Sequence, residues 1–203
     1  MAGKTGQGLV DYVKSKLGLP YVYGTKMEPL TKEKYDWLKK TYGSNVWDSD
    51  AQKIGKVCCD CSGLISAYTG IQRSSQNFRD TAKQRNPIST VATAPVGALV
   101  WKQGHIGVYI GMENGVPMYI AEDGSAYGCR KAKLPGVFTH WFLTPDIDYT
   151  AQGKSPEETT VDNAIKAGII TDKAHWLGVL NGTIAPNKAY IKIMMDNANK
   201  KIT

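Results

Sequence analysis

The stretch that decides the fold is DCSGLI, residues 60–65, in which a cysteine stands where a helix begins. Apolar residues recur after it at helical spacing, which predicts a helix that ends at Gly70. The face that begins with the thiol consists of Cys61, Leu64, Ile65 and Tyr68. Because the free N–H groups of a helix start stabilise negative charge, Cys61 is a candidate nucleophilic thiolate beside an oxyanion site. The competing interpretation is an ordinary core cysteine.

A second stretch, GHIGVYIG at residues 104–111, places His105 at the start of a predicted strand. A helix that carries a thiol and a strand that carries an imidazole can meet in space although they are distant in sequence. A neutral imidazole there would accept the thiol proton and later donate it to the leaving amine, as in papain-like catalysis. Without Cys61, the same residue would be interpreted as an ordinary histidine at a strand edge.

The rest of the first 150 residues predicts short helices and strands around these two stretches. Helices are expected at about 6–17 and 32–42, the second after a capping Thr31 and ending at Gly43. Strands are expected at 96–101, 105–111, 118–122 and 137–143, with turns at Gly104 and at Asn114-Gly115. Together these elements predict an α+β fold.

Three motifs, taken in order, resemble a known family. PYVYG at residues 20–24, DCSGLI at 60–65 and GHIGVYIG at 104–111 are similar to the three signatures of the NlpC family of papain-like cell-wall peptidases. The resemblance covers about residues 1–145 and looks closest to the phage and prophage endolysin branch. In that branch a helical insertion separates the tyrosine strand from the cysteine, as residues 31–55 do here. The implied domain has N-terminal helices packed on an antiparallel sheet.

The resemblance also implies an activity and the residues that perform it. It implies a cysteine endopeptidase, or less often an amidase, that cuts peptidoglycan stem peptides, typically between D-glutamate and the diamino acid. It implies no metal and no other cofactor. Cys61 would be the nucleophile, His105 the general base and acid, and Tyr21 a tyrosine that lines the cleft near the oxyanion. The alternative for Tyr21 is a half-buried strand aromatic.

Two residues that flank the nucleophile are candidate substrate-binding residues. Asp60 would either contact a substrate amine or cap the helix, the cap being the more common role for an aspartate there. Ser62 lies on the other side of Cys61 and is the second candidate.

The third catalytic position departs from the family pattern. A polar residue is expected on the strand after the histidine strand, where it would orient the imidazole through its other nitrogen. An ungapped comparison anchored on Tyr127-Gly128 places Ala121 there, and a shift of one residue places Glu122 there. We favour Glu122 because an acid would hold the ring and stabilise imidazolium, with Asp123 as the alternative. A solvent-facing acid at a turn is the competing interpretation.

Composition narrows the classes of partner. The 203 residues carry a formal charge of +7, which favours an acidic partner, but the basic residues form no long run or nucleic-acid motif. Nucleic acid is therefore not expected. The sequence shows no apolar run of membrane-spanning length, and its first residues lack the apolar segment of a signal peptide, so none is expected. We expect synthesis in the cytoplasm, action on the cell wall after release, and no stable membrane insertion; self-association stays open.

The chain has four cysteines and three histidines, of which Cys61 and His105 have an assigned chemistry. The cysteines are Cys58, Cys59, Cys61 and Cys129. Their spacing lacks the paired knuckles of structural zinc sites, so no metal is expected and reduced thiols beneath or beside the site are the simpler interpretation. His140 and His175 each lie beside a tryptophan and are interpreted as structural residues.

The chain divides into three predicted parts: a catalytic domain at 1–148, a linker at 149–154, and a small helical domain at 155–203. Ser155 and Pro156 start the first helix of the last part, and two more helices are expected at about 172–180 and 187–200. Such a thin core either docks on the catalytic domain or binds the cell wall.

The sequence therefore predicts a peptidoglycan endopeptidase of the phage endolysin type. The alternatives are an amidase that cuts between muramic acid and L-alanine, and a papain-like scaffold that only binds wall peptides. Acyl transfer to an amine is a third possibility.

Overall fold

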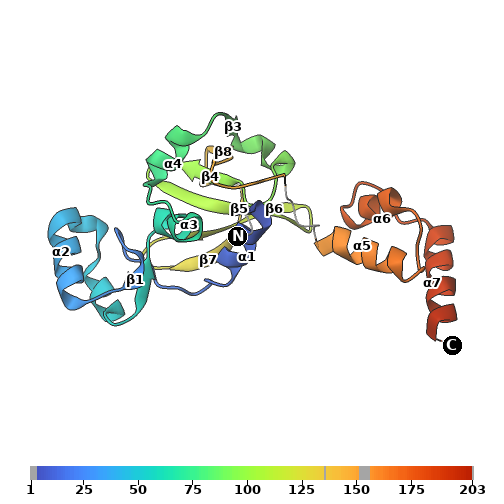
Figure 1. Cartoon of the computed structure of the whole chain (residues 1–203), viewed down its shortest axis with the longest axis horizontal. Helices are drawn as coiled ribbons and strands as arrows, with labels where there is room; N and C mark the ends of the chain where they lie inside the picture. The colour runs from blue at the N-terminus through green and yellow to red at the C-terminus, as the bar shows by residue number, and fades with distance from the viewer. Residues whose placement is uncertain (1–3, 135, 151–155, 203) are drawn as a thin grey trace. The chain divides into compact units, whose positions relative to one another are not determined.

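The structure is a computed structural model that describes residues 4–134, 136–150 and 156–202. The chain forms two compact units, Met1–Gln152 and Gly153–Thr203, and each is described by itself (Figure 1). Most of the predicted linker and the predicted cap Ser155 lie outside the described residues.

The centre of the first unit is an antiparallel sheet, which in the described residues has six strands in the order β3-β8-β4-β5-β6-β7. The strands are β3 (Arg85–Pro87), β4 (Leu99–Lys102), β5 (His105–Glu113), β6 (Val116–Glu122), β7 (Cys129–Lys133) and β8 (His140–Phe142). Helices and antiparallel strands thus combine as predicted. The two-residue turn between β5 and β6 is also confirmed, because Asn114 and Gly115 both have the positive φ that a tight hairpin requires.

Both faces of the sheet are buried. Each face receives its own set of side chains, because successive strand residues point to opposite sides. One face contributes Val108 and Ile120 to a core that includes Leu9 and Leu64. The other face contributes Tyr109 and Tyr119 to a second core, together with Phe138. This double burial explains the near-continuous apolar run of β5.

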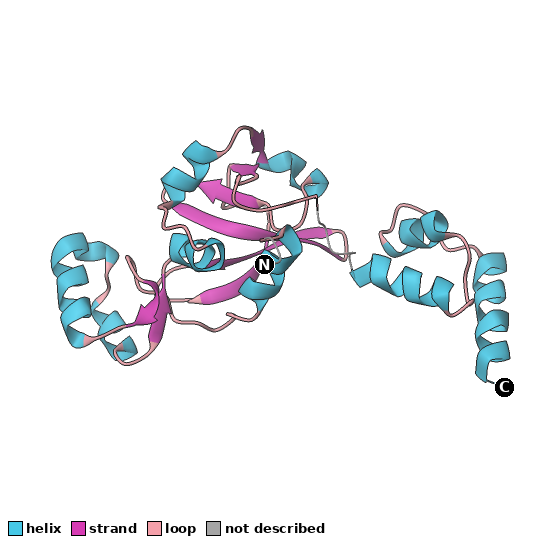
Figure 2. Cartoon of the chain, viewed as in Figure 1, coloured by secondary structure: helices cyan, strands magenta, loops and turns pink. Residues whose placement is uncertain are grey.

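Three helices contribute to the first core: α1 (Gly6–Lys14), α3 (Cys61–Thr69) and α4 (Ser75–Thr81). Figure 2 shows α1 and α3 next to the long strands of the sheet. Helix α1 is shorter than the predicted 6–17, since residues 15–17 turn more tightly and Leu17 is exposed. Helix α4 was not predicted because Phe78 is its single buried residue, so it has no apolar periodicity to detect.

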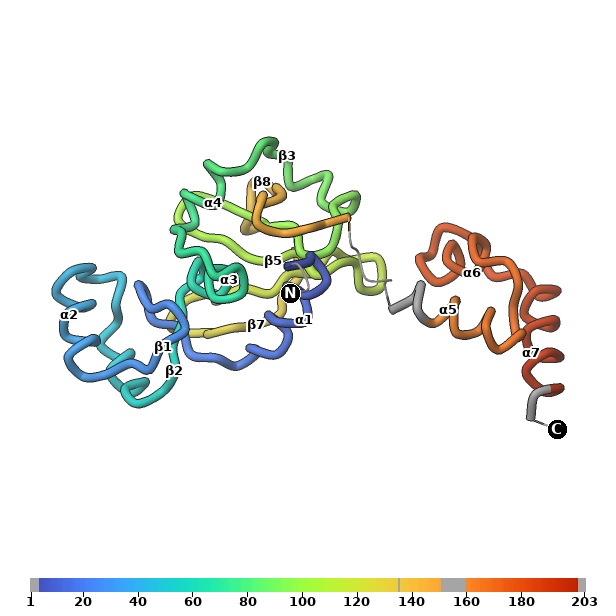
Figure 3. The backbone as a smooth tube through the Cα atoms, in the orientation of Figure 1, coloured from blue at the N-terminus to red at the C-terminus, as the bar shows by residue number. Residues whose placement is uncertain are grey.

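The insertion between the tyrosine segment and Cys61 has a small core of its own. It contains α2 (Lys32–Tyr42), the 3-10 turns η1 (Gly43–Asn45) and η2 (Asp48–Lys53), and a two-stranded sheet of β1 (Lys26–Pro29) and β2 (Val57–Cys59). Helix α2 has the predicted Thr31 cap and ends at Gly43. The core of the insertion consists of Leu38 from α2 together with Val22, Leu30, Val46 and Cys58. The insertion is therefore a structured lobe, and its chain path is traced in Figure 3.

Strand β2 leads directly into α3 and sets the start of that helix. Asp60 accepts a hydrogen bond from the backbone N–H of Gly63, which caps the helix. Gly63 itself is required by close packing, since a Cβ there would lie 2.6 Å from the carbonyl oxygen of Thr25. The first turn of α3 is thus held against the segment that follows Tyr21.

The described part of the second unit contains α5 (Pro156–Lys166), α6 (Lys173–Leu180) and α7 (Lys188–Ile202). Val161 and Ile170 are its buried aliphatic residues, and His175 stacks on Tyr190 with ring centroids 4.0 Å apart. Among the residues that the structure describes, there is no helix with the length and apolar character needed to cross a membrane.

Candidate active site

The thiol and the imidazole lie at the contact between α3 and β5. Cys61 is the first residue of α3, His105 is the first residue of β5, and the two elements pack together. The backbone N–H of Ile106, the residue that follows His105, lowers the pKa of Cys61. The predicted meeting of helix and strand is present in the structure.

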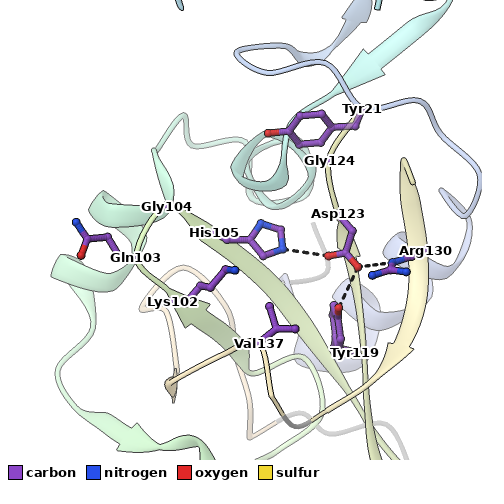
Figure 4. Close-up of a pocket in the computed structure, with 10 residues that line it drawn as sticks. All are labelled: Tyr21, Lys102, Gln103, Gly104, His105, Tyr119, Asp123, Gly124, Arg130 and Val137. Atoms are coloured by element: carbon purple, nitrogen blue, oxygen red, sulfur yellow. Dashed lines mark hydrogen bonds and ion pairs between the residues drawn. The ribbon is translucent and has the colours of Figure 1, made fainter. Parts of the chain in front are cut away.

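A cavity of about 380 Å³ opens beside the imidazole (Figure 4). Its lining comes from several elements: Tyr21, Lys102, Gln103, Gly104, His105, Tyr119, Asp123, Gly124, Arg130 and Val137. Cys61 is 7% exposed and does not line the cavity itself. Cys61 is nevertheless the first residue of α3, which packs against β5, the strand that begins with the cavity residue His105.

Asp123 is the carboxylate that holds the imidazole. Its Oδ1 lies 3.0 Å from Nε2 of His105, and its Oδ2 accepts hydrogen bonds from the Tyr119 hydroxyl and from Nε of Arg130. Burial alone would raise the pKa of Asp123, but the bonds from His105, Arg130 and Tyr119 outweigh it and hold that pKa below its usual range. The three dashed bonds are drawn in Figure 4.

This contact fixes which nitrogen of His105 is available for chemistry. A carboxylate only accepts hydrogen bonds, so Nε2 carries the proton and Nδ1 is the basic nitrogen. The ring is held in place by Phe138, which stacks on it with centroids 5.4 Å apart and an interplanar angle of 12°. The imidazole therefore has a defined tautomer and a defined plane.

The preference for Glu122 as the imidazole's partner is wrong, and the alternative, Asp123, is the residue in contact. Glu122 is the last residue of β6 and is fully buried, and neither of its carboxyl oxygens has a hydrogen-bond partner among the described residues. Burial, reinforced by Asp60, raises the pKa of Glu122 to about 9. Adjacent strand residues point to opposite sides, which is why a shift of one position changes the surroundings completely. Ala121 lies in the second core.

The resting form of Cys61 is a thiol. Burial raises its pKa to about 12, and the nearby Asp60 adds to this. The N–H groups of Ile106 and Ser62 and the charge of Lys26 lower the pKa but do not compensate. The thiolate expected from the helix start alone is thus absent at neutral pH, and formation of the nucleophile requires a base.

Asp60 and Ser62 are buried and hydrogen-bonded within the protein, and their predicted contact with substrate stays a prediction. Both carboxylate oxygens of Asp60 accept from the ammonium of Lys26, at 2.8 and 2.7 Å, and Oδ2 also accepts from the N–H of Gly24. The Ser62 hydroxyl donates to Asp60 and accepts from Lys26. These side chains anchor the start of α3, and their bonding capacity is used within the protein.

Tyr21 is 9% exposed and forms part of the cavity wall. A parallel bridge to Cys59 holds its backbone beside the strand that precedes Cys61. Burial raises the pKa of Tyr21, followed by Cys61 and Asp60, so its hydroxyl stays protonated and can donate. Its position agrees with the cleft-lining role that was expected.

Sequence reasoning missed several residues that complete the site. Tyr119 and Arg130 fix Asp123, Phe138 supports the ring, and Lys26 binds Asp60. Strand β7, which carries Arg130, was not predicted because its alternation of lysine and small residues resembles a polar loop. The register that places Arg130 opposite Ala121 exists only after strand pairing.

The other cysteines and His140 do not line the cavity. Cys58, Cys59 and Cys129 are buried free thiols, and burial raises the pKa of Cys58 to about 11 and of Cys129 to about 12. In the described ranges, no three of the histidine, cysteine and acidic side chains are grouped as metal ligands. His140 hydrogen-bonds Thr139.

The site thus combines a cysteine at a helix start, a histidine at a strand start, and an aspartate in hydrogen-bond contact with the histidine. Two solved structures are similar to the chain. The P60 domain of an antigen from M. avium subspecies paratuberculosis is 23% identical over 71% of this chain and 98% of its own, with a TM-score of 0.45. The peptidoglycan hydrolase RipB from Mycobacterium tuberculosis is 24% identical over 71% of this chain and 67% of its own, also with a TM-score of 0.45. No protein-family profile matches the sequence, and neither does any curated protein.

Proposed function

We propose that this chain is a cysteine endopeptidase that hydrolyses peptidoglycan stem peptides at the bond between D-glutamate and the diamino acid. The observation that carries the proposal is the hydrogen bond between Asp123 and His105 at the start of β5, the strand that packs against the helix beginning with Cys61. Nucleophile, base and orienting acid are the three parts that acyl transfer through a thioester requires. The choice of a cell-wall peptide as substrate rests on the three sequence motifs.

In the first half of the reaction, Nδ1 of His105 takes the proton of the Cys61 thiol. The resulting thiolate attacks the scissile carbonyl carbon, and the carbonyl electron pair moves to oxygen. We propose that backbone N–H groups at the start of α3 and the hydroxyl of Tyr21, which lines the cavity, donate to that oxyanion. The charge of Asp123 stabilises the imidazolium, which then protonates the leaving amine as the carbon–nitrogen bond breaks.

In the second half, water replaces the amine. His105 takes a proton from the water, the hydroxide adds to the thioester carbonyl, and the carbon–sulfur bond breaks with return of the proton to sulfur. The products are a peptide with a new carboxylate and a peptide with a new amino group. The high pKa of Cys61 makes the thiol, and not a stored thiolate, the starting and final state.

Mass spectrometry of digested peptidoglycan tests the proposal. The wild-type protein is expected to expose new amino groups on the diamino acid, and Cys61→Ala and His105→Ala are expected to expose none. His140→Ala is the matched control, because that histidine lies outside the cavity and should leave the products unchanged. Cleavage by the Cys61→Ala protein would refute the mechanism.

The same digests address the alternatives. Freed L-alanine N-termini would identify an amidase. Clearing of wall suspensions to the same extent by wild type and Cys61→Ala would identify a module that only binds. Product formation that depends on an added amine would identify acyl transfer.

The biological setting that we propose is a phage-type endolysin, made in the cytoplasm and acting on the wall after release. The helical unit is proposed either to bind the wall or to dock on the catalytic unit. Sedimentation of the wild-type protein and of a fragment ending at residue 150 with purified walls distinguishes the two, since only a wall-binding unit changes the bound fraction.

A further inference from the structure

The cavity beside His105 carries an excess of positive charge. Lys102 and Arg130 are its cationic residues, and Asp123 is its acidic residue. Arg130 is already used, because its Nε donates to Asp123 and its guanidinium lies 4.1 Å from the centroid of the Tyr127 ring. The charges of Arg130 and Asp123 balance each other, so Lys102 is the remaining charged residue of the cavity.

Strand pairing directs Lys102 toward the imidazole. Lys102 is the last residue of β4 and pairs directly with His105 across a two-residue turn. Residues that face each other in an antiparallel pair project from the same side of the sheet, with Cβ atoms about 5 Å apart. Figure 4 shows both side chains at the rim of the same cavity.

The ammonium of Lys102 is not used by the protein. Within the described part of the chain, no hydrogen bond or ion pair joins it to another residue. The other two lysines near the site differ in this respect. Lys26 is bound to Asp60 and Lys53 is bound to Asp50, at 2.7 and 2.6 Å. A half-buried lysine without a partner next to a base is placed to receive an anion from the substrate.

We infer that Lys102 binds a free carboxylate of the substrate close to the scissile amide, so that the site selects an acidic peptide. The inference rests on the proposed function and specifies its substrate class. A glutamate linked through its side-chain carboxyl keeps its α-carboxylate a few bonds from the scissile carbonyl, and a diamino acid can carry a second carboxylate on the other side. Lysine suits either source, because its ammonium is a compact charge on a flexible stem.

Four synthetic stem peptides test the inference by amidation. One has both carboxylates free, two have one or the other converted to the amide, and one has both converted. The wild-type enzyme is expected to lose roughly tenfold in kcat/KM when the relevant carboxylate is amidated, mainly through KM. The amide that produces the loss identifies which carboxylate Lys102 binds.

Variants of Lys102 test whether this side chain causes the preference for the acidic peptide over the amidated one. Lys102→Met is expected to lower kcat/KM about tenfold on the acidic peptide and to leave the fully amidated peptide unchanged, which removes the preference. Lys102→Arg should restore most of the preference. Lys83→Met, a change of an exposed lysine outside the cavity, is the control and should behave as wild type. An equal loss on both peptides, or an unchanged preference, overturns the inference.

A binding measurement separates this inference from the reaction itself. Cys61→Ala and Cys61→Ala/Lys102→Met proteins are titrated with the acidic and amidated peptides by calorimetry. Tighter binding of the acidic peptide that depends on Lys102 supports the inference even if wild type cleaves neither peptide, in which case the proposed function fails alone. Cleavage without discrimination leaves the function standing and refutes the role of Lys102. Absence of binding to every peptide refutes the inference.

Discussion

Asp123 acts on the reaction through the imidazole that it holds. Asp123→Ala removes the acceptor for Nε2 and the charge that stabilises imidazolium, so we expect kcat to fall about a hundredfold. Asp123→Asn keeps an acceptor but loses the charge, and an intermediate loss is expected. Steady-state kinetics on a stem peptide measure both losses. An unchanged kcat in Asp123→Ala would contradict the positioning role.

Glu122 is expected to affect stability and not catalysis. Its folded pKa of about 9 exceeds the ordinary value of 4.5, so the unfolded chain loses the proton first and stability declines as pH rises from 4.5 to 9. By pH 7 the loss is about 3 kcal/mol. Glu122→Gln should remove this decline while leaving kcat within about twofold.

Urea unfolding at pH 5 and pH 8 measures the effect of Glu122→Gln. The variant should gain stability over wild type at pH 8 and not at pH 5, because its amide is as unpartnered as the neutral acid it replaces. The comparison stays below about pH 8.5, where buried thiols begin to contribute with the same sign. Parallel pH dependences in the two proteins would contradict the assignment.

For individual residues, the sequence identified those that are marked by a local pattern. It missed those whose role depends on contacts between distant segments. Cys61 and His105 could be located because each opens an element with a recognisable apolar pattern. The choice between Glu122 and Asp123 depends on where β6 ends, and an error of one residue reverses the side to which a side chain points. Lys26 and Arg130 depend on contacts between distant segments, which the sequence does not display.

Among the elements, η2 connects two walls of the cavity. Lys53 at its end donates to the carbonyl oxygens of Tyr21 and Ser125, at 2.7 and 2.9 Å. Its partner Asp50 is fully buried and accepts from the Ser125 hydroxyl as well. The lobe formed by the insertion therefore fixes both the tyrosine and the loop that begins with Asp123.

Lys53→Met should lower both stability and activity. It leaves Asp50 buried without its cation, and we expect a loss of about 3 kcal/mol or more in the free energy of unfolding. Asp50→Asn/Lys53→Met should recover much of the stability. The activity should stay low in the double variant, because the carbonyl oxygens of Tyr21 and Ser125 still lack the hydrogen bonds from Lys53. Chemical denaturation and peptide cleavage assays measure the two quantities.

An exposed ion pair on the same lobe provides the control. Asp48 pairs with Lys39 but is 95% exposed, so Asp48→Asn should change stability by less than about 0.5 kcal/mol and leave the activity unchanged. If the Asp48 and Lys53 changes altered stability and activity equally, the specific contacts of Lys53 would not be what links the lobe to the cavity.

The lobe also shows what element patterns can and cannot predict. Helix α2 was predicted with both of its ends, since Thr31 and Gly43 are strong local signals. Strands β1 and β2 are too short to have a detectable period, and their pairing brings together residues far apart in the chain. The lobe was therefore predicted as a surface insertion, and its own core and its contact with Ser125 were not foreseen.

For the whole molecule, the first compact unit contains the thiol, the imidazole and the cavity described above. Every residue that lines the cavity belongs to Met1–Gln152. A fragment ending at residue 150 should therefore unfold cooperatively and cleave soluble stem peptides within about twofold of the full chain. Circular dichroism during urea unfolding and a peptide assay test this. A fragment that folds but does not cleave peptides would show that the second unit takes part in the chemistry.

The deep position of the Cys61 sulfur also affects how the protein withstands reactive chemicals. Alkylating reagents and peroxides attack the thiolate, and a cysteine residue that is 7% exposed, with a thiol pKa of about 12, offers almost none of it. A protein that meets oxidants after it leaves a reducing interior would retain its nucleophile for longer. Slow labelling of Cys61 by iodoacetamide in the folded protein, compared with the urea-unfolded chain, is the corresponding signature.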